Sequence, residues 1–178
     1  DLHEAIESAG SDEVVLLPNN SNVVMAAEQA ARVAGKSVHV VATNSIPAGL
    51  AALVAFNGER SAEENADAMR EALAGLVTGE IALASRDAST NGVAVREGEF
   101  LALLDGDAIA SGAAFDEVAR ALVERLLAEP RDVLTLLTGE DAPPLNGLLA
   151  ELASGHPELE LDVHEGGQPH YPLLLSAE

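Results

Sequence analysis

The sequence contains no cysteine and no tryptophan, and it has only one tyrosine and three phenylalanines among its 178 residues. Without cysteine, the chain can form no disulfide, no thiolate nucleophile and no cysteine-ligated zinc site. Because aromatic side chains are scarce, the hydrophobic core has to be built from Ala, Val, Leu and Ile, and apolar residues make up 48% of the sequence. A chain of this length is expected to form one domain or two small lobes.

Basic residues are scarce too, with 9 Lys and Arg against 30 Asp and Glu, which gives a formal net charge of -21. So negative a surface repels phosphate backbones and anionic lipids, and we therefore expect no binding to nucleic acid or to membrane surfaces. No apolar run approaches the roughly 18 to 20 residues that cross a bilayer, so we expect no membrane insertion. The composition favours a soluble acidic domain.

Short apolar runs typical of strands alternate with longer segments of helical periodicity. The predicted strands outside the middle of the chain are 13–17, 37–42, 132–137, 159–164 and 171–176, and the predicted helices are 2–9, 22–34, 47–56, 61–76, 115–128 and 143–153. Between residues 78 and 110, the turn signals Asn91-Gly92, Glu97-Gly98 and Asp105-Gly106 separate short strands, which indicates an antiparallel meander.

These elements predict an α/β fold of mostly parallel β/α units with an antiparallel meander insert. We expect residues 1–178 to form a single domain, and a division into lobes 1–85 and 86–178 is the alternative. In open parallel sheets, ligands bind outside the carboxyl ends of the strands, where loops lead into helix N-termini. A binding site is therefore expected in the loops that follow the predicted strands.

Four such loops are unusually polar, and they span residues 18–22, 43–49, 138–141 and 165–171. If their strands are parallel neighbours, the loops meet on one edge of the sheet, where short amide and hydroxyl side chains with free helix N–H groups could hold a carboxylate or phosphate. The candidate residues in these loops are Asn19, Asn20, Asn22, Thr43, Ser45, Gly167, Gln168, His170 and Tyr171. Asn and Ser are also common helix caps and turn residues, so a purely structural role stays open.

Other motifs give weaker signals. Arg86 and Asp87 follow a predicted strand and are either a buried ion pair or an interaction point. Asp105-Gly106-Asp107 lacks the further ligands of a magnesium or calcium loop, so a hairpin turn is the better interpretation. No P-loop, GxGxxG or GxSxG motif and no metal-binding spacing of histidines is present, so we predict no catalytic residues, no metal site and no ATP site in this chain.

The same loops carry a family likeness. The segments PNNSN at 18–22, TNSIPAG at 43–49, SRDA at 85–88 and GGQPHY at 166–171 together resemble the C-terminal domain of FakA-type fatty-acid kinases. These FakA-like proteins contain a DAK2 domain and are often labelled dihydroxyacetone kinases. The likeness spans nearly the whole chain, and it implies a DegV/DhaK-like fold.

The resemblance implies a bacterial, cytoplasmic, two-component kinase whose FakA component is a homodimer. That component phosphorylates the carboxylate of a fatty acid held by a separate DegV/FakB-type lipid-binding protein. The resemblance further implies that ATP and Mg belong to an N-terminal kinase domain absent from this chain, so no cofactor is expected here. The part played by this domain is then docking of the lipid-binding partner, with the loop residues named above, Arg86 and Asp87 as candidate contacts.

Two further expectations belong to this resemblance. The rival to docking is a binding or enzymatic site for a phosphate, carboxylate or sugar-like ligand at the carboxyl edge of the strands, as in other DegV and DhaK relatives. Family members also have a strand and a Gly-Gly-Gln segment just before the helix that corresponds to residues 2–9, whereas this sequence begins inside that helix. We therefore expect the chain to be an excised piece that lacks an edge strand.

Overall fold

The computed structural model describes residues 2–178, and it divides after Leu76 into two compact units. The second unit runs from Val77 to Glu178. The division falls earlier in the chain than the lobe boundary suggested by the sequence, because the strand that follows Leu76 pairs within the second unit.

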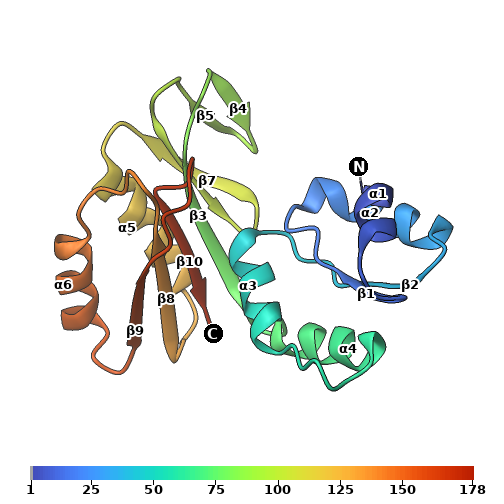
Figure 1. Ribbon diagram of the computed structural model, residues 1–178. Coiled ribbons are helices and arrows are strands. Elements are labelled where there is room, and N and C mark those ends of the chain that lie inside the picture. Colours follow the sequence, from blue (N-terminus) through green and yellow to red (C-terminus); the bar gives the residue numbers. More distant parts are fainter. Residues whose placement is uncertain (1) are drawn as a thin grey trace. The chain divides into compact units, whose positions relative to one another are not determined.

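The first unit consists of a two-stranded sheet and four helices (Figure 1). Its elements are α1 (Leu2–Ser8), β1 (Glu13–Leu16), α2 (Ser21–Val33), β2 (Ser37–Val40), α3 (Ile46–Val54) and α4 (Ala62–Ala72). Strands β1 and β2 are parallel, with Glu13 opposite Ser37 and Leu16 opposite Val40. The central hydrophobic cluster of this unit is small, with Val41, Ala52, Ala66 and Met69 as its buried members. Ile6 and Ala27 are fully buried outside this cluster.

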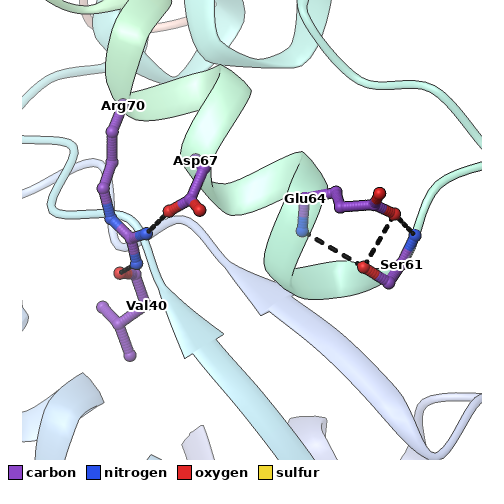
Figure 2. A network of polar contacts seen from close by, with 5 residues as sticks. All are labelled: Val40, Ser61, Glu64, Asp67 and Arg70. Carbon is purple, nitrogen blue, oxygen red and sulfur yellow. Dashed lines mark hydrogen bonds and ion pairs between the residues drawn. The ribbon is translucent and has the colours of Figure 1, made fainter.

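Polar side chains fix the start of helix α4 and attach its last turn to β2 (Figure 2). Ser61 and Glu64 form a capping box, in which the Glu64 N–H donates to Ser61 Oγ at 3.2 Å and the Ser61 N–H donates to the Glu64 carboxylate at 2.9 Å. At the other end of the helix, Arg70 donates to the Val40 carbonyl oxygen at 3.0 Å and pairs with Asp67 at 2.7 Å. The cap begins the helix, and the arginine ties the helix to the end of β2.

The second unit contains a six-stranded sheet in the order β7-β6-β3-β10-β8-β9 and a small β4–β5 hairpin. Its elements are β3 (Val77–Leu83), β4 (Ala88–Thr90), β5 (Val93–Val95), β6 (Phe100–Leu104), β7 (Asp107–Gly112), α5 (Phe115–Leu126), β8 (Val133–Thr138), α6 (Asn146–Gly155), β9 (Glu160–Glu165) and β10 (Leu173–Ala177). Helices α5 and α6 and the strands of the sheet are drawn in Figure 1. The two helices bury their apolar sides in one large cluster with the sheet, which includes Leu122, Leu134, Leu136 and Leu175.

The predicted α/β fold and its antiparallel meander are confirmed, but the balance of strand directions differs from the expectation of mostly parallel units. Within residues 2–178, parallel pairing is confined to β1–β2 and β8–β9, and the other strand pairs are antiparallel. The reason is the placement of β10, which lies between β3 and β8 and runs antiparallel to both. Alternation of strands and helices along a sequence does not reveal such an insertion.

The turns of the meander are as predicted. Asn91-Gly92 joins β4 to β5, and Asp105-Gly106 joins β6 to β7. All four residues have positive φ angles, as a two-residue hairpin turn of type I′ requires. Within the described part of the chain, no helix is long and apolar enough to cross a lipid bilayer.

Candidate functional site

The loops after β1 and β2 are joined by a reciprocal pair of hydrogen bonds between Asn19 and Thr43. The Asn19 N–H donates to Thr43 Oγ1 at 2.9 Å, and the Thr43 hydroxyl donates to Asn19 Oδ1 at 2.8 Å. Thr43 is buried, and Asn19 has a φ of 54°, a left-handed conformation that asparagine tolerates better than most residues. The two residues therefore hold the two loops together.

The start of α3 lies directly against this pair. Ser45 is buried and caps α3, because its hydroxyl accepts the Ala48 N–H at 3.2 Å. Gly49 packs under the Asn19 carboxamide so closely that a Cβ at this position would collide with it. A close approach of this kind requires glycine. Gly49 was not among the predicted site residues, although it belongs to the polar 43–49 loop.

Asn20 and Asn22 lie at the start of α2 and are exposed to solvent. Asn20 is the N-cap, and its Oδ1 accepts the Asn22 N–H at 2.9 Å. The cap satisfies a backbone donor of the first helical turn, which is the structural role that stayed open for asparagine in this loop. The Asn22 side chain stands on the exposed first turn, where it is available to a partner.

The loops after β8 and β9 are joined in a different way, through backbone groups. The Thr138 carbonyl oxygen accepts the N–H groups of Gly166 and Gly167 at 2.9 and 3.0 Å. Gln168 Nε2 then donates to the carbonyl oxygens of Leu137 at 3.1 Å and Tyr171 at 3.0 Å. The Gln168 side chain thus holds its own loop against the end of β8.

Gly139 is the counterpart of Gly49 in this second loop pair. Its N–H donates to the Pro172 carbonyl oxygen at 2.9 Å, and a Cβ on it would collide with the backbone oxygens of Tyr171 and Gln168. The polar character of this loop was visible in the sequence. The need for glycine comes from a chain segment about thirty residues away in sequence, so no local signal could reveal it.

Three other predicted residues complete this loop. Gly167 and His170 both have positive φ angles, of 63° and 70°, and His170 is exposed. Tyr171 is partly buried, and burial raises its pKa above the usual range, with a further contribution from the negative charge of Glu80. Glu80 is only 8% exposed, and this buried carboxylate was not among the predicted site residues.

Arg86 and Asp87 do not form the buried ion pair that was one of two expectations for them. Both residues are exposed, in the turn between β3 and β4. Asp87 Oδ1 accepts the Glu97 N–H at 2.8 Å, so its role is to close the turn against the β5–β6 connection. Exposure leaves the second expectation, a point of interaction, as a prediction.

The four polar loops meet in two pairs, one in each unit. The first pair brings Asn19, Thr43 and Ser45 together, and the second brings Gln168 and Tyr171 together with Gly139. Most of these polar groups already bond to protein atoms. Residues 2–178 contain no group of three or more His, Asp or Glu side chains that could hold a metal ion. The geometry is that of rigid, hydrogen-bonded loops with a few exposed polar side chains.

The family of FakA-like C-terminal domains, which takes its description from fatty acid kinase, matches residues 1–178, the whole chain. The chain belongs to this FakA-like C-terminal family. Among curated relatives, Protein YloV of Bacillus subtilis is 35% identical over 100% of this chain and 32% of its own length. An uncharacterized protein of Staphylococcus epidermidis is 34% identical over 100% of this chain and 33% of its own length. The chain thus spans about a third of the relatives that it matches.

Solved structures with the same fold are DegV-family proteins. The DegV-family protein Cg2579 of Corynebacterium glutamicum has a TM-score of 0.59 and 20% identity, covering 99% of this chain and 79% of its own. The protein TM841 of Thermotoga maritima, for which a fatty acid binding function is described, has a TM-score of 0.55 and 13% identity, covering 99% of this chain and 81% of its own. At these identities the likeness shows the fold, and the expected DegV-like fold is confirmed.

Proposed function

We propose that this FakA-like C-terminal domain is a non-catalytic docking domain of a cytoplasmic fatty acid kinase. Its partner is a separate DegV-type protein that carries the fatty acid, and the acyl carboxylate is phosphorylated by another domain of the longer protein. The observation that carries the proposal is the match of the whole chain to the FakA-like C-terminal family. In this proposal, ATP and Mg bind outside this chain, in a homodimeric parent protein.

The hydrogen bonds within the polar loops support docking of a protein partner over a small-molecule or catalytic site. A small-molecule site or a catalytic site needs polar groups that are aimed at the ligand and not already used in the protein. Thr43 and Asn19 instead bond to each other, and Gln168 bonds to backbone oxygens. Loops fixed in this way present a surface of constant shape, which lowers the entropy lost when a protein partner binds.

Exposed side chains on the polar loops and on the turn between β3 and β4 are the proposed contacts. On the first unit they are Asn20 and Asn22, at the start of α2. On the second unit they are His170, Arg86 and Asp87. Asn20 also caps α2, so Asn22 is the position at which a contact can be removed with the least effect on the fold.

The charge of the chain indicates the kind of partner surface. With a formal net charge of -21, the domain attracts a partner that presents a basic patch. Such attraction raises the association rate and is screened by salt, with a Debye length of about 8 Å at physiological ionic strength. Binding is therefore expected to weaken between low and moderate salt.

The test is a calorimetric titration of the protein with a fatty-acid-loaded DegV-type protein from the same organism, at two salt concentrations. We expect micromolar or tighter binding without ATP. Asn22→Ala should weaken it several-fold, whereas Asn146→Ala, at an exposed asparagine that begins α6, should leave it unchanged. Circular dichroism of both variants checks that they are folded.

Two outcomes contradict the proposal. Absence of binding by a folded protein would overturn docking, and amide chemical-shift changes at Asn19 and Thr43 on addition of phosphate or acetate would then favour a small-ligand site. Binding that does not depend on salt would contradict the electrostatic part alone.

A further inference from the structure

Helix α2 presents an uncharged row of residues on its outer side. Asn22, Met25, Gln29 and Val33 follow one another at intervals of three or four residues, so they lie along one side of the helix. All four are exposed, Met25 by 74% and Val33 by 73%. The other side of the helix contains the fully buried Ala27, and α2 packs against α1 and β2. We call the row of four exposed residues the α2 ridge.

The α2 ridge differs from the outer sides of two other amphipathic helices. Every exposed residue of α4 and α5 is charged, and these residues are Glu63, Glu64, Asp67, Arg70 and Glu71 in α4 and Asp116, Glu117, Arg120, Glu124 and Arg125 in α5. Single apolar residues are common on protein surfaces. Met25 and Val33, with the neutral Gln29 between them, form instead an apolar strip, and contact with another molecule would remove its area from water.

The ridge can be covered without burying an unpaired charge. The charged residues of α2 are Glu28 and Arg32, which lie beside the ridge and pair with each other at 3.8 Å. Towards the N-terminus, no charged residue occurs between Glu13 and Glu28. A partner that binds here therefore avoids the large cost of desolvating carboxylates, which a domain with 30 acidic residues would otherwise impose.

The ridge continues a surface that already contains proposed contacts. It begins at Asn22, and the Asn22 N–H donates to the N-cap Asn20 at 2.9 Å, so the polar loop and the helix are fixed to each other. From Asn22 to Val33 the ridge is about 16 Å long at the helical rise of about 1.5 Å per residue. A stable interface buries about 800 Å² on each partner. The ridge reaches such an area only together with the adjoining loop.

The charge of the chain distinguishes between possible occupants. Two copies that meet at this ridge would bring two formal charges of -21 together, and this repulsion opposes self-association. A protein with a basic patch is instead attracted by the acidic domain, and the ridge offers it an apolar place to bind. Methionine is suited to such a contact, because its flexible and polarisable side chain adapts to the shape of a pocket.

We propose that the α2 ridge is the apolar centre of the surface that docks the DegV-type protein carrying the fatty acid, with Met25 inserted into a pocket that has a basic rim. The inference rests on the proposed docking function and names the residues that supply most of the binding energy. Asn22 lies at the polar end of the ridge, where truncation is expected to cost less than at Met25.

Oxidation by hydrogen peroxide shows which molecule covers the ridge. The reagent transfers an oxygen atom to an accessible methionine sulfur, and the chain has two methionines, of which Met25 is exposed and Met69 is 1% exposed. In the full-length natural protein, followed peptide by peptide by mass spectrometry, we expect Met25 to oxidise at least about tenfold faster than Met69. Saturating fatty-acid-loaded DegV-type protein should slow Met25 at least about fivefold and leave Met69 unchanged.

The outcomes separate this inference from the docking function. If calorimetry shows binding while the oxidation of Met25 is unchanged, the ridge is not the docking surface and docking itself stands. If no binding is found, both are overturned. Oxidation of Met25 as slow as that of Met69 in the protein alone would also overturn the inference. Slowing that rises with protein concentration would then assign the ridge to a second copy, and slowing at every concentration to another segment of the polypeptide.

Neutral substitutions measure what the ridge contributes to affinity. Met25→Gln keeps the side-chain length and the helix propensity, and we expect it to raise the Kd for the DegV-type protein at least about tenfold. Val33→Thr should raise it about threefold. The matched control is Val54→Thr, because Val54 ends α3 as Val33 ends α2 and is 88% exposed. It should change the Kd by less than about twofold.

All three substitutions leave the net charge unchanged, so the salt dependence of binding should not change either. Circular dichroism checks that the variants are folded. A Kd for Met25→Gln equal to that of the unmodified protein, or equal effects of Val33→Thr and Val54→Thr, would overturn the inference.

Discussion

The two parallel strand pairs, β1–β2 and β8–β9, end in polar loops that are held together by hydrogen bonds, but the strands themselves are supported differently. Strand β8 is also paired with β10, in the middle of a six-stranded sheet. Strand β1 has a neighbour on one side only within the described residues. Both loop pairs are held by a few hydrogen bonds, although the strands beneath them have different numbers of paired neighbours. Such a loop pair can therefore form without a paired strand on both sides of it.

The hydrophobic cores of the two units also differ, and the core of the second unit is the larger. In the second unit, Phe100 and Phe115 meet edge to face with ring centroids 5.4 Å apart, next to a cluster of buried leucines from both helices and the sheet. In the first unit, four fully buried residues form the centre, and two of them are alanines. The second unit is therefore expected to be the more stable of the two, because the stabilisation grows with the apolar area buried.

The largest predicted effect is that of Leu136→Ala in the larger core. Leu136 is fully buried, and the cavity should cost about 3 to 4 kcal/mol. Met69→Ala in the smaller core should cost less, about 2 kcal/mol, because Met69 already borders a hollow. Tyr171 is the single tyrosine and lies in the second unit, so tyrosine fluorescence during urea unfolding reports that unit, and circular dichroism reports both. Equal losses for the two variants would contradict the comparison of the cores.

The next effect concerns the two loop glycines. Gly139→Ala places a methyl group against backbone oxygens that cannot move independently, and should cost about 2 to 3 kcal/mol. In Gly49→Ala, the new methyl group would contact the side chain of Asn19, which can rotate away if it gives up its hydrogen bond to Thr43. Part of this cost is offset because alanine is favoured over glycine in a helix. We expect a net cost of about 1 kcal/mol or less. Thermal unfolding of both variants gives the order, and a larger cost at Gly49 would show that its loop pair is the more rigid.

A smaller effect separates the two threonines at the strand ends. Thr43→Val removes a buried hydroxyl that makes two hydrogen bonds to Asn19, which should cost about 1 to 2 kcal/mol. The Thr138 hydroxyl donates to the His164 carbonyl oxygen at 3.3 Å at a more exposed position, so Thr138→Val should stay within about 0.5 kcal/mol of the unmodified protein. Urea unfolding measures both. A neutral Thr43→Val would mean that the first loop pair does not depend on this bond.

The smallest effect is on pH dependence in the second loop pair. Burial, and then the charge of Glu80, raise the pKa of Tyr171 above its ordinary value near 10. The folded state therefore binds this proton more tightly than the unfolded state, and the stability that it contributes is present below about pH 10 and is lost as the pH rises through the raised pKa. Absorbance titration should show a midpoint that Glu80→Gln lowers in part, because burial remains. A midpoint unaffected by Glu80→Gln would remove the charge as a cause.

Features encoded over a few residues could be predicted from the sequence. The Ser61–Glu64 capping box and the Asn91-Gly92 and Asp105-Gly106 turns follow from local geometry, and the structure contains all three. The order of strands could not be predicted, because β10 pairs with β3 and β8 through contacts between distant parts of the sequence.

In the candidate site too, local features could be predicted from the sequence, whereas features that depend on distant contacts could not. The polar character of the loops was visible in the sequence, and Asn20 is the cap that its residue type suggested. Whether Asn19 and Gln168 would face a ligand or bond to the protein depends on which loops become neighbours. The requirement for glycine at position 139 depends on the backbone of residues 168–171, which no local pattern contains.

The central position of β10 has a consequence for synthesis of the chain on the ribosome. Strands β7, β6 and β3 form one half of the six-stranded sheet, β8 and β9 form the other, and β10 is the link between them although it is translated after all five. Until Leu173–Ala177 have left the exit tunnel, the two halves have no strand to join them and their inner edges stay open to other chains. The second unit is thus expected to complete its fold only after translation of its last strand, and the nascent chain is most prone to aggregation just before that point.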